Sequence, residues 1–204
     1  MSTINADTLT VQNLTVSGTL SYESVTAQAS LPAVPSPGTI LETLVGLCDG
    51  RSITVASGTY TMPNVTSAQT APSAFTQVTG SNITYTPPAG TKHVIYEFNF
   101  THASVDANGI SYFKYRVDGV DVNRSFFVAS DNSGHDYVNF MWEHTIGDGD
   151  DADTGKFQTW TTGKTLDLVF NRHGSSNEGE VHGQYYTSSF NTYHTPKIRI
   201  TAIA

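Results

Sequence analysis

The chain has a single cysteine, few charged residues and no long apolar run. Cys48 is the only cysteine among 204 residues, which excludes an intramolecular disulfide and a zinc site built from several cysteines. Leu44 and Leu47 precede it, so we expect Cys48 to be buried in an apolar environment. No stretch approaches the roughly 20 apolar residues of a membrane-spanning helix, and Met1 is not followed by the basic and apolar regions of an export signal. We therefore expect a soluble protein without membrane insertion.

Basic residues are also scarce. Lysine and arginine total 10 against 18 acidic residues, which gives a net charge of -8, and no basic run interrupts this balance. A protein that binds nucleic acid needs a cationic surface, so the composition excludes a nucleic-acid partner. Charged residues make up only 14% of the chain, and serine, threonine, asparagine and glycine supply most of its polarity. This composition favours strands and turns over helices.

The first 28 residues are predicted to form an extended N-terminal arm. The tripeptide Leu-Thr-Val occurs twice there, so that Leu9, Val11, Leu14 and Val16 repeat one short pattern. A β-prone segment with so few apolar groups cannot bury them by itself, so it is expected to pair with another chain. We interpret residues 1–28 as an attachment arm.

Residues 29–50 are predicted to form a linker with one short helix. Three prolines within residues 29–38 favour a semi-rigid spacer. Thr39 and Glu42 then have the spacing of a capping box. Apolar residues follow on one helical face, namely Ile40, Leu41, Leu44, Leu47 and Cys48. The sequence thus predicts a helix that ends at Asp49 and Gly50.

From Arg51 onward the apolar residues alternate with polar ones, which is typical of half-buried strands. The alternation is clearest in residues 93–102 and returns in residues 113–117, 138–146, 166–170 and 198–202. Weaker strands are expected at residues 52–56 and 59–62. The pairs Asn108-Gly109 and Asp118-Gly119 are predicted to form tight hairpins. About eight such strands predict an all-β fold, an antiparallel β-sandwich or jelly roll, over residues 51–204.

Three segments resemble bacteriophage structural proteins. Residues 82–100 look like the first strands of jelly-roll heads on phage fibres, which resemble the trimeric complement and tumour-necrosis-factor type heads. Residues 9–20 resemble the extended repeats of fibre shafts, and residues 39–60 are similar to a linker in marine phage structural proteins. The resemblance implies a homotrimeric decoration protein or short fibre at the virion surface. Its arm would dock on a capsid or tail protein, and its head would stabilise the particle or adhere to the host.

A cluster of carboxylates is the sharpest local feature of the sequence. Asp148, Asp150, Asp151 and Asp153 offer hard oxygen ligands of the kind that calcium prefers. The spacing departs from an EF-hand, because Ala152 occupies an expected ligand position and no glutamate closes the loop. A solvated turn explains the same residues. We expect no other cofactor.

No catalytic motif is recognisable. The chain contains no Gly-x-Ser-x-Gly elbow and no phosphate-binding glycine loop, and its seven histidines lack the spacing of metal ligands. We therefore expect a protein that is not an enzyme. The alternative to a virion structural role is a carbohydrate-binding module, acting with or without calcium. Its contacts for a receptor glycan would be Trp160, Tyr185, Tyr186 and Arg172. The same aromatic residues also suit a sandwich core or a subunit interface.

Overall fold

The structure is a computed structural model that describes residues 35–104, 108–131, 135–174, 179–183 and 193–204. Residues from Pro35 to Ala204 make up one compact unit. The described residues contain strands and turns but no helix, and so no helix that could cross a membrane. The predicted arm contacts Leu9, Val11, Leu14 and Val16 lie outside the described residues.

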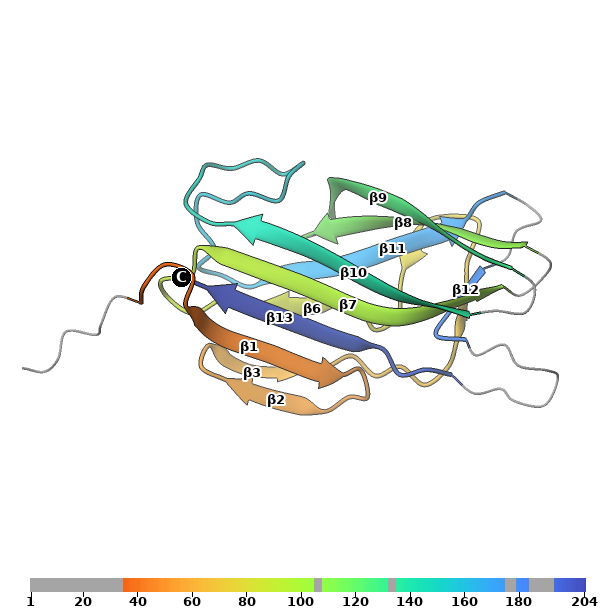
Figure 1. The fold of residues 1–204 in the computed structure, drawn as a ribbon, viewed down its shortest axis with the longest axis horizontal. Coiled ribbons are helices and arrows are strands. Elements are labelled where there is room, and N and C mark those ends of the chain that lie inside the picture. The colour runs from red at the N-terminus through yellow and green to blue at the C-terminus, as the bar shows by residue number, and fades with distance from the viewer. Residues whose placement is uncertain (1–34, 105–107, 132–134, 175–178, 184–192) are drawn as a thin grey trace, which may run out of the picture. The chain divides into compact units, whose positions relative to one another are not determined.

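Two antiparallel sheets and a separate hairpin make up the unit (Figure 1). In the larger sheet, β10 and β13 flank β7, β1 pairs with the far side of β13, and β12 and β4 extend the sheet at the other end of β7. The smaller sheet has the order β5-β11-β8-β9, with β6 also paired to β11. The larger sheet comprises β1 (Ile40–Leu47), β4 (Gln69–Thr70), β7 (His93–Ser104), β10 (His135–Thr145), β12 (Gly179–Val181) and β13 (Lys197–Ile203). The smaller sheet comprises β5 (Thr76–Gln77), β6 (Ile83–Tyr85), β8 (Asn108–Val117), β9 (Val120–Asp131) and β11 (Lys164–Arg172). The hairpin is β2 (Ser52–Val55) and β3 (Gly58–Thr61), as the sequence predicts.

The core lies between the two sheets. Alternate residues of β7 are buried, as their period of two predicts, and they meet alternate residues of β8. Tyr96 stacks on Tyr115 with ring centroids 5.5 Å apart, and Phe100 contacts Phe113 at the same separation. Because each sheet buries one face in this contact, the predicted antiparallel β-sandwich is confirmed. Cys48 is fully buried as expected, and burial raises the pKa of its thiol to about 12.

The helix predicted after the prolines is wrong, because residues 40–47 form strand β1. β1 pairs with β13 at the end of the chain, with Leu44 opposite Ile200. Its inward positions are Glu42, Leu44 and Gly46, which follow a period of two that the scattered apolar residues conceal. A side chain at Gly46 would overlap Ile53 of the hairpin, so a glycine, which weakens a helix, is required here by close packing.

One of the two predicted hairpin turns is confirmed. Asp118 and Gly119 join β8 to β9 with φ of 51° and 79°, the positive values that such a turn requires. The prediction for Asn108 and Gly109 is wrong, because both belong to β8 and the preceding strand β7 lies in the other sheet. Gly109 is needed for a close approach, since a Cβ there would crowd the backbone of Ser104.

The described chain begins beside its own C-terminus. The backbone N–H of Gly38 donates to the carbonyl of Ala204, and the N–H of Ala204 donates to the carbonyl of Thr39. Gly38 therefore lies at the end of the sheet where β1 starts and β13 ends. The opposite end of these two strands is roughly 20 Å away, at about 3.3 Å for each residue of β13.

Candidate ligand-binding site on the outer face of the larger sheet

The outer face of the larger sheet, formed by β1, β13, β7 and β10, mixes exposed apolar side chains with paired charges. A cross-strand row runs from Val45 through Arg199 and Glu97 to Met141. Arg199 Nε lies 3.4 Å from Glu97 Oε2 in this row. Val45 and Met141, at its two ends, are 45% and 57% exposed. Such side chains on a folded surface are candidates for contact with a partner.

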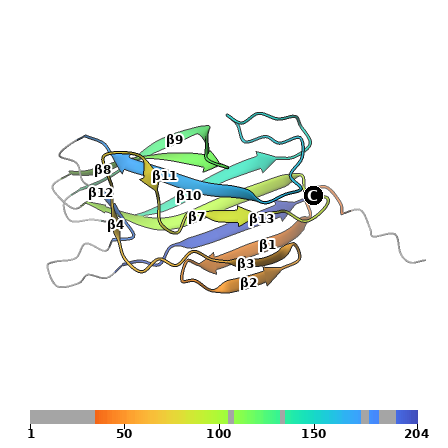
Figure 2. The same cartoon turned by 180° about the vertical axis from the view of Figure 1, so that it is seen from behind.

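A groove forms at the far end of this face because β7 changes its pairing partner there. The last pair with β13 joins Asn99 to Lys197, and the first pair with β12 joins His102 to Val181. Phe100 and Thr101 of β7 lie between these two pairs and are paired to neither β13 nor β12, so residues 193–196 before β13 leave space beside β7. The opening has a volume of about 290 Å³, and Figure 2 shows the same strands from behind.

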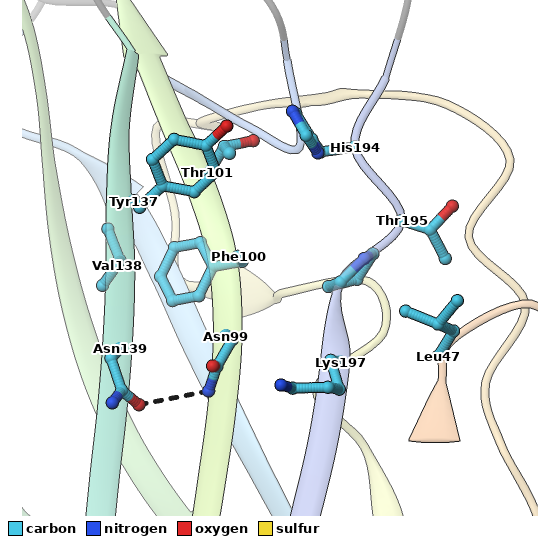
Figure 3. A pocket seen from close by; sticks show the side chains of 11 residues that line it. Leu47, Asn99, Phe100, Thr101, Tyr137, Val138, Asn139, His194, Thr195 and Lys197 are labelled. Atoms are coloured by element: carbon cyan, nitrogen blue, oxygen red, sulfur yellow. Dashed lines mark hydrogen bonds between the residues drawn. The ribbon is translucent and has the colours of Figure 1, made fainter. Parts of the chain in front are cut away.

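Side chains from β1, β7, β10 and β13 and from the segment before β13 line the groove (Figure 3). On one side Tyr137 and Asn139 project from β10, and Lys197 lies across from them at the start of β13. The full lining is Leu47, Asn99, Phe100, Thr101, Tyr137, Val138, Asn139, His194, Thr195, Pro196 and Lys197. The groove therefore combines apolar walls with neutral hydrogen-bonding groups and a single formal cation.

An exposed aromatic ring marks the rim of the groove. Tyr137 is 74% exposed, the highest value among the large apolar side chains of the described residues. Its ring meets His194 edge-on at 5.6 Å and His135 edge-on at 5.5 Å. The two histidines restrict the ring while leaving most of it open to solvent. A restrained, solvated tyrosine suits stacking against a ligand that has an apolar face.

Two amides lie on the floor of the groove. Asn99 on β7 and Asn139 on β10 are directly opposite each other, and the Nδ2 of Asn99 donates to the Oδ1 of Asn139 over 3.1 Å. Each amide has more donors and acceptors than this bond uses. Both side chains therefore retain hydrogen-bonding capacity toward the groove.

The wall behind the groove is a buried polar network. Thr101 is 1% exposed, and its hydroxyl donates to the carbonyl of Gly183 over 3.2 Å. The backbone N–H of His194 donates to the carbonyl of His182, which fixes the segment that carries the His194 ring. His182 Nε2 lies 2.7 Å from the carbonyl of Thr79, and burial lowers the pKa of this histidine to about 4. His182 is therefore neutral, and it holds the segment behind the groove without adding a charge to the groove.

Of the predicted receptor contacts, Trp160 is excluded from the surface. It is 4% exposed and belongs to the core, where its Nε1–H donates to the carbonyl of Tyr85 over 3.1 Å. The prediction that Trp160 contacts a glycan is therefore wrong. Inside the sandwich its large apolar ring is buried and its single donor has an acceptor.

The remaining predicted contacts are not brought to the groove. Arg172 ends β11 in the other sheet, where it is half-buried and its backbone N–H donates to the carbonyl of Pro72. Tyr185 and Tyr186 lie outside the described residues.

The acidic cluster folds as a hydrogen-bonded turn. Asp150 accepts from the backbone N–H of Gln158, and Asp148 Oδ2 lies 3.3 Å from the ammonium of Lys156. Asp151 accepts from the N–H of Asp153 and from the Thr154 hydroxyl, which lowers the pKa of its carboxyl. Within the described residues, which include all four aspartates, no three acidic, histidine or cysteine side chains converge as metal ligands do. The carboxylates instead serve separate partners of the turn.

A chain of polar side chains that sequence inspection missed crosses the interior. His102 Nε2 lies 2.8 Å from Ser111 Oγ, His102 Nδ1 lies 2.8 Å from Ser130 Oγ, and Ser130 donates to Asp136 over 2.7 Å. These residue types occur in nucleophilic active sites, but Ser111 and His102 are fully buried. A side chain at Gly179 would overlap both, so the glycine allows β12 to pack directly against them. Burial lowers the pKa of His102 to about 4, and the chain ties together β7, β8, β9 and β10.

Comparisons with known proteins give little guidance. No protein-family model matches the chain, and no curated protein matches it. Among solved structures, one titled "Structure of infectious bursal disease virus Gx strain" is similar over 76% of this chain, with 12% identity and a TM-score of 0.25. The chain spans 41% of the length of that protein. A TM-score this low does not identify a common fold, so the function has to be inferred from the chain's own residues.

Proposed function

We propose that this protein is a non-enzymatic virion structural protein, a homotrimeric capsid decoration protein or short fibre. Its N-terminal arm docks on a capsid or tail protein, and its sandwich is the head exposed at the virion surface. The observation that carries the proposal is the pair of exposed apolar side chains on the outer strands of the larger sheet, Val45 on β1 and Met141 on β10. These side chains suit contact between copies.

The two outer strands are suited to a closed cyclic oligomer. Among the described strands, β1 pairs only with β13 and β10 pairs only with β7, so each leaves one edge available. The β1 edge of one copy can meet the β10 edge of the next, which is the head-to-tail contact that closes into a cyclic oligomer. Between these edges, Arg199 pairs with Glu97 and His93 Nδ1 lies 2.8 Å from Glu143. A neighbouring copy therefore meets charges that already have partners.

The virion assignment is supported by the resemblance of residues 9–20 and 82–100 to phage fibre proteins, which also suggests threefold symmetry and a jelly-roll head. The position of the chain ends is consistent with it. Gly38 lies beside Ala204 at one end of the sheet, and the groove near Lys197 lies at the other. A head attached through the segment before Pro35 would present the groove away from its attachment point.

The test is the mass of the full-length protein by size-exclusion chromatography with light scattering. We expect a trimer for the natural chain and single copies for Met141→Glu and for Val45→Glu, because a buried carboxylate at the contact is strongly unfavourable. Phe127→Glu is the matched control, since Phe127 is 58% exposed on the smaller sheet. A monomeric natural chain would refute the self-assembling head. Trimeric Met141→Glu and Val45→Glu proteins would refute the edge contact.

Carbohydrate recognition is a second candidate function, and the groove beside Tyr137 favours it. The exposed ring, the amide pair and the single cation are the kinds of groups that bind a small polar ligand in an otherwise apolar pocket. This function is compatible with the first, because a virion head can adhere to its host through such a groove.

A further inference from the structure

We propose that the groove between β10, β7 and the start of β13 binds one neutral sugar residue, with Tyr137 as the stacking surface and Asn99 and Asn139 as the hydrogen-bonding pair. The inference deepens the proposed surface role by naming the ligand class and the residues, and these differ from the aromatic residues that the sequence suggests. It depends on the geometry of the groove, not on the number of copies in the assembly.

The apolar contribution comes from Tyr137 and the walls. A pyranose has a face of C–H groups that can lie against an aromatic ring. Tyr137 offers such a ring already oriented by His135 and His194, so little side-chain entropy is lost on binding. Leu47 supplies apolar surface on the side of the groove opposite Tyr137 (Figure 3), and Pro196 adds to the apolar lining.

The polar contribution comes from the floor. Neighbouring hydroxyls of a sugar each act as donor and acceptor, and a planar amide offers both functions in a fixed geometry. Asn99 and Asn139 lie on adjacent strands, and their mutual bond holds both amides in place. A ligand that presents two adjacent hydroxyls can bond both amides at once.

Size and charge limit the ligand class. A volume of about 290 Å³ is at the small end of ligand pockets and suits about one sugar ring. Lys197 is the single formal cation of the lining, and the chain as a whole carries a charge of -8. A phosphorylated or multiply anionic ligand would require more positive charge than the groove supplies. A purely apolar ligand would leave the amides unsatisfied, so a neutral polyhydroxylated ring is the best match.

The binding experiment uses full-length protein and the methyl glycosides of glucose, galactose, mannose and N-acetylglucosamine. Saturation-transfer NMR identifies a bound glycoside, and calorimetry gives its affinity. We expect at least one to bind with a dissociation constant on the order of 1 mM, because a single sugar offers few contacts. Glucuronic acid and inorganic phosphate are the anionic comparisons and are expected to bind more weakly. Absence of binding by all four glycosides, or a preference for the anions, would overturn the proposal.

Variants locate the site. Tyr137→Ala should weaken binding on the order of tenfold, and Tyr137→Phe should retain most of the affinity because the stacking ring remains. Asn139→Leu should also weaken binding, since it removes one amide. Phe127→Ala is the matched control, because it removes an aromatic ring of similar exposure from the smaller sheet. Unchanged binding by Tyr137→Ala, or equal loss in Phe127→Ala, would show that the sugar binds elsewhere.

The outcomes also separate this inference from the proposed assembly. Light scattering on each variant reports the number of copies independently of sugar binding. A trimer without sugar binding would leave the structural role intact and reject the groove. A monomer that binds a glycoside through Tyr137 would reject the assembly and retain the site.

Discussion

The interior of the sandwich and the outer face of the larger sheet are built by alternate residues of the same strands, yet they use polar groups in opposite ways. On β7, His102 points inward and bonds Ser111 and Ser130, and both of its ring nitrogens have partners. On the outer side of the same strand, Asn99 makes one amide bond to Asn139 and retains further capacity. Interior polar groups therefore stabilise the fold, and outer ones remain available to a ligand.

Aromatic residues show the same division. Phe113 is fully buried and contacts four other rings between the sheets. Tyr137 contacts two histidines at one rim and is otherwise exposed. Substitutions inside should thus change the free energy of unfolding, whereas substitutions outside should change binding or association.

Acid should destabilise the fold through its buried histidines. Burial lowers the pKa of His102, His144 and His182 from 6.5 to about 4, so each remains neutral in the folded protein. The unfolded chain binds a proton at each histidine below pH 6.5. Stability is therefore fully present above pH 6.5 and is lost as the pH falls toward 4, by about 3 kcal/mol for each histidine. Urea unfolding at a series of pH values measures this loss.

A variant isolates the histidine contribution to acid unfolding. His182 has a positive φ of 65°, which asparagine tolerates, so His182→Asn should retain the backbone and reduce the loss of stability in acid. His93→Gln is the control, because His93 is partly exposed on the outer face beside Glu143. An equal pH dependence in the natural chain and His182→Asn would contradict the assigned role of burial.

Removing a ring from the core should have the next largest effect. Phe113→Ala leaves a cavity among Phe100, Phe126 and Phe170, and we expect it to destabilise the fold by about 3–5 kcal/mol. Phe127→Ala, next to Phe126 on β9, should cost only about 1 kcal/mol, because its ring is 58% exposed and its loss removes the stack on Tyr112 at 4.6 Å. Chemical denaturation of both variants measures the difference. Similar costs would mean that the exposed side of the smaller sheet stabilises the fold as strongly as the core does.

The two faces also differ in their carboxylates. Glu42 is 7% exposed and accepts bonds from Tyr85 and from the N–H and hydroxyl of Ser57. Glu42→Leu leaves these donors without an acceptor and should cost about 1–3 kcal/mol. Glu97→Leu on the outer face removes a partly exposed pair with Arg199 and should cost about 1 kcal/mol or less. Thermal melts compare them, and adding Tyr85→Phe to Glu42→Leu should recover part of the loss.

Alternation in the sequence predicts the sandwich, but it does not identify every strand. From Val94 to Phe100 every second residue of β7 is apolar and buried, so a period of two fits and the prediction is confirmed. In residues 40–48 the apolar residues fit one face of a helix, and the strand period is concealed because Glu42 and Gly46 occupy inward positions. The outcome depends on β13, which lies at the other end of the chain and provides a partner for β1. The sequence of residues 40–48 carries no information about this distant partner strand.

The groove is harder to predict than the fold because no motif encodes it. Tyr137 is one of several aromatic residues in β10 and belongs to no recognisable motif, and its neighbour His194 comes from a distant part of the chain. The available signal was an apolar ring at a position where the alternation of β10 predicts the solvent side. Trp160 was wrongly predicted as a surface contact because it is a large aromatic residue. In the structure its N–H donates to the buried carbonyl of Tyr85.

The smallest expected effect concerns the acidic turn, for which the sequence left both a calcium site and a solvated turn open. Melting temperatures of the full-length protein should be the same with excess calcium and with a chelator, because Asp148, Asp150 and Asp151 bond separate partners within the turn. Asp151→Ala should lower the melting temperature slightly in both conditions, since it removes the acceptor for the Asp153 N–H and the Thr154 hydroxyl. A calcium-dependent rise that Asp148→Ala abolishes would show that the carboxylates rearrange around an ion, which would make this turn a binding site.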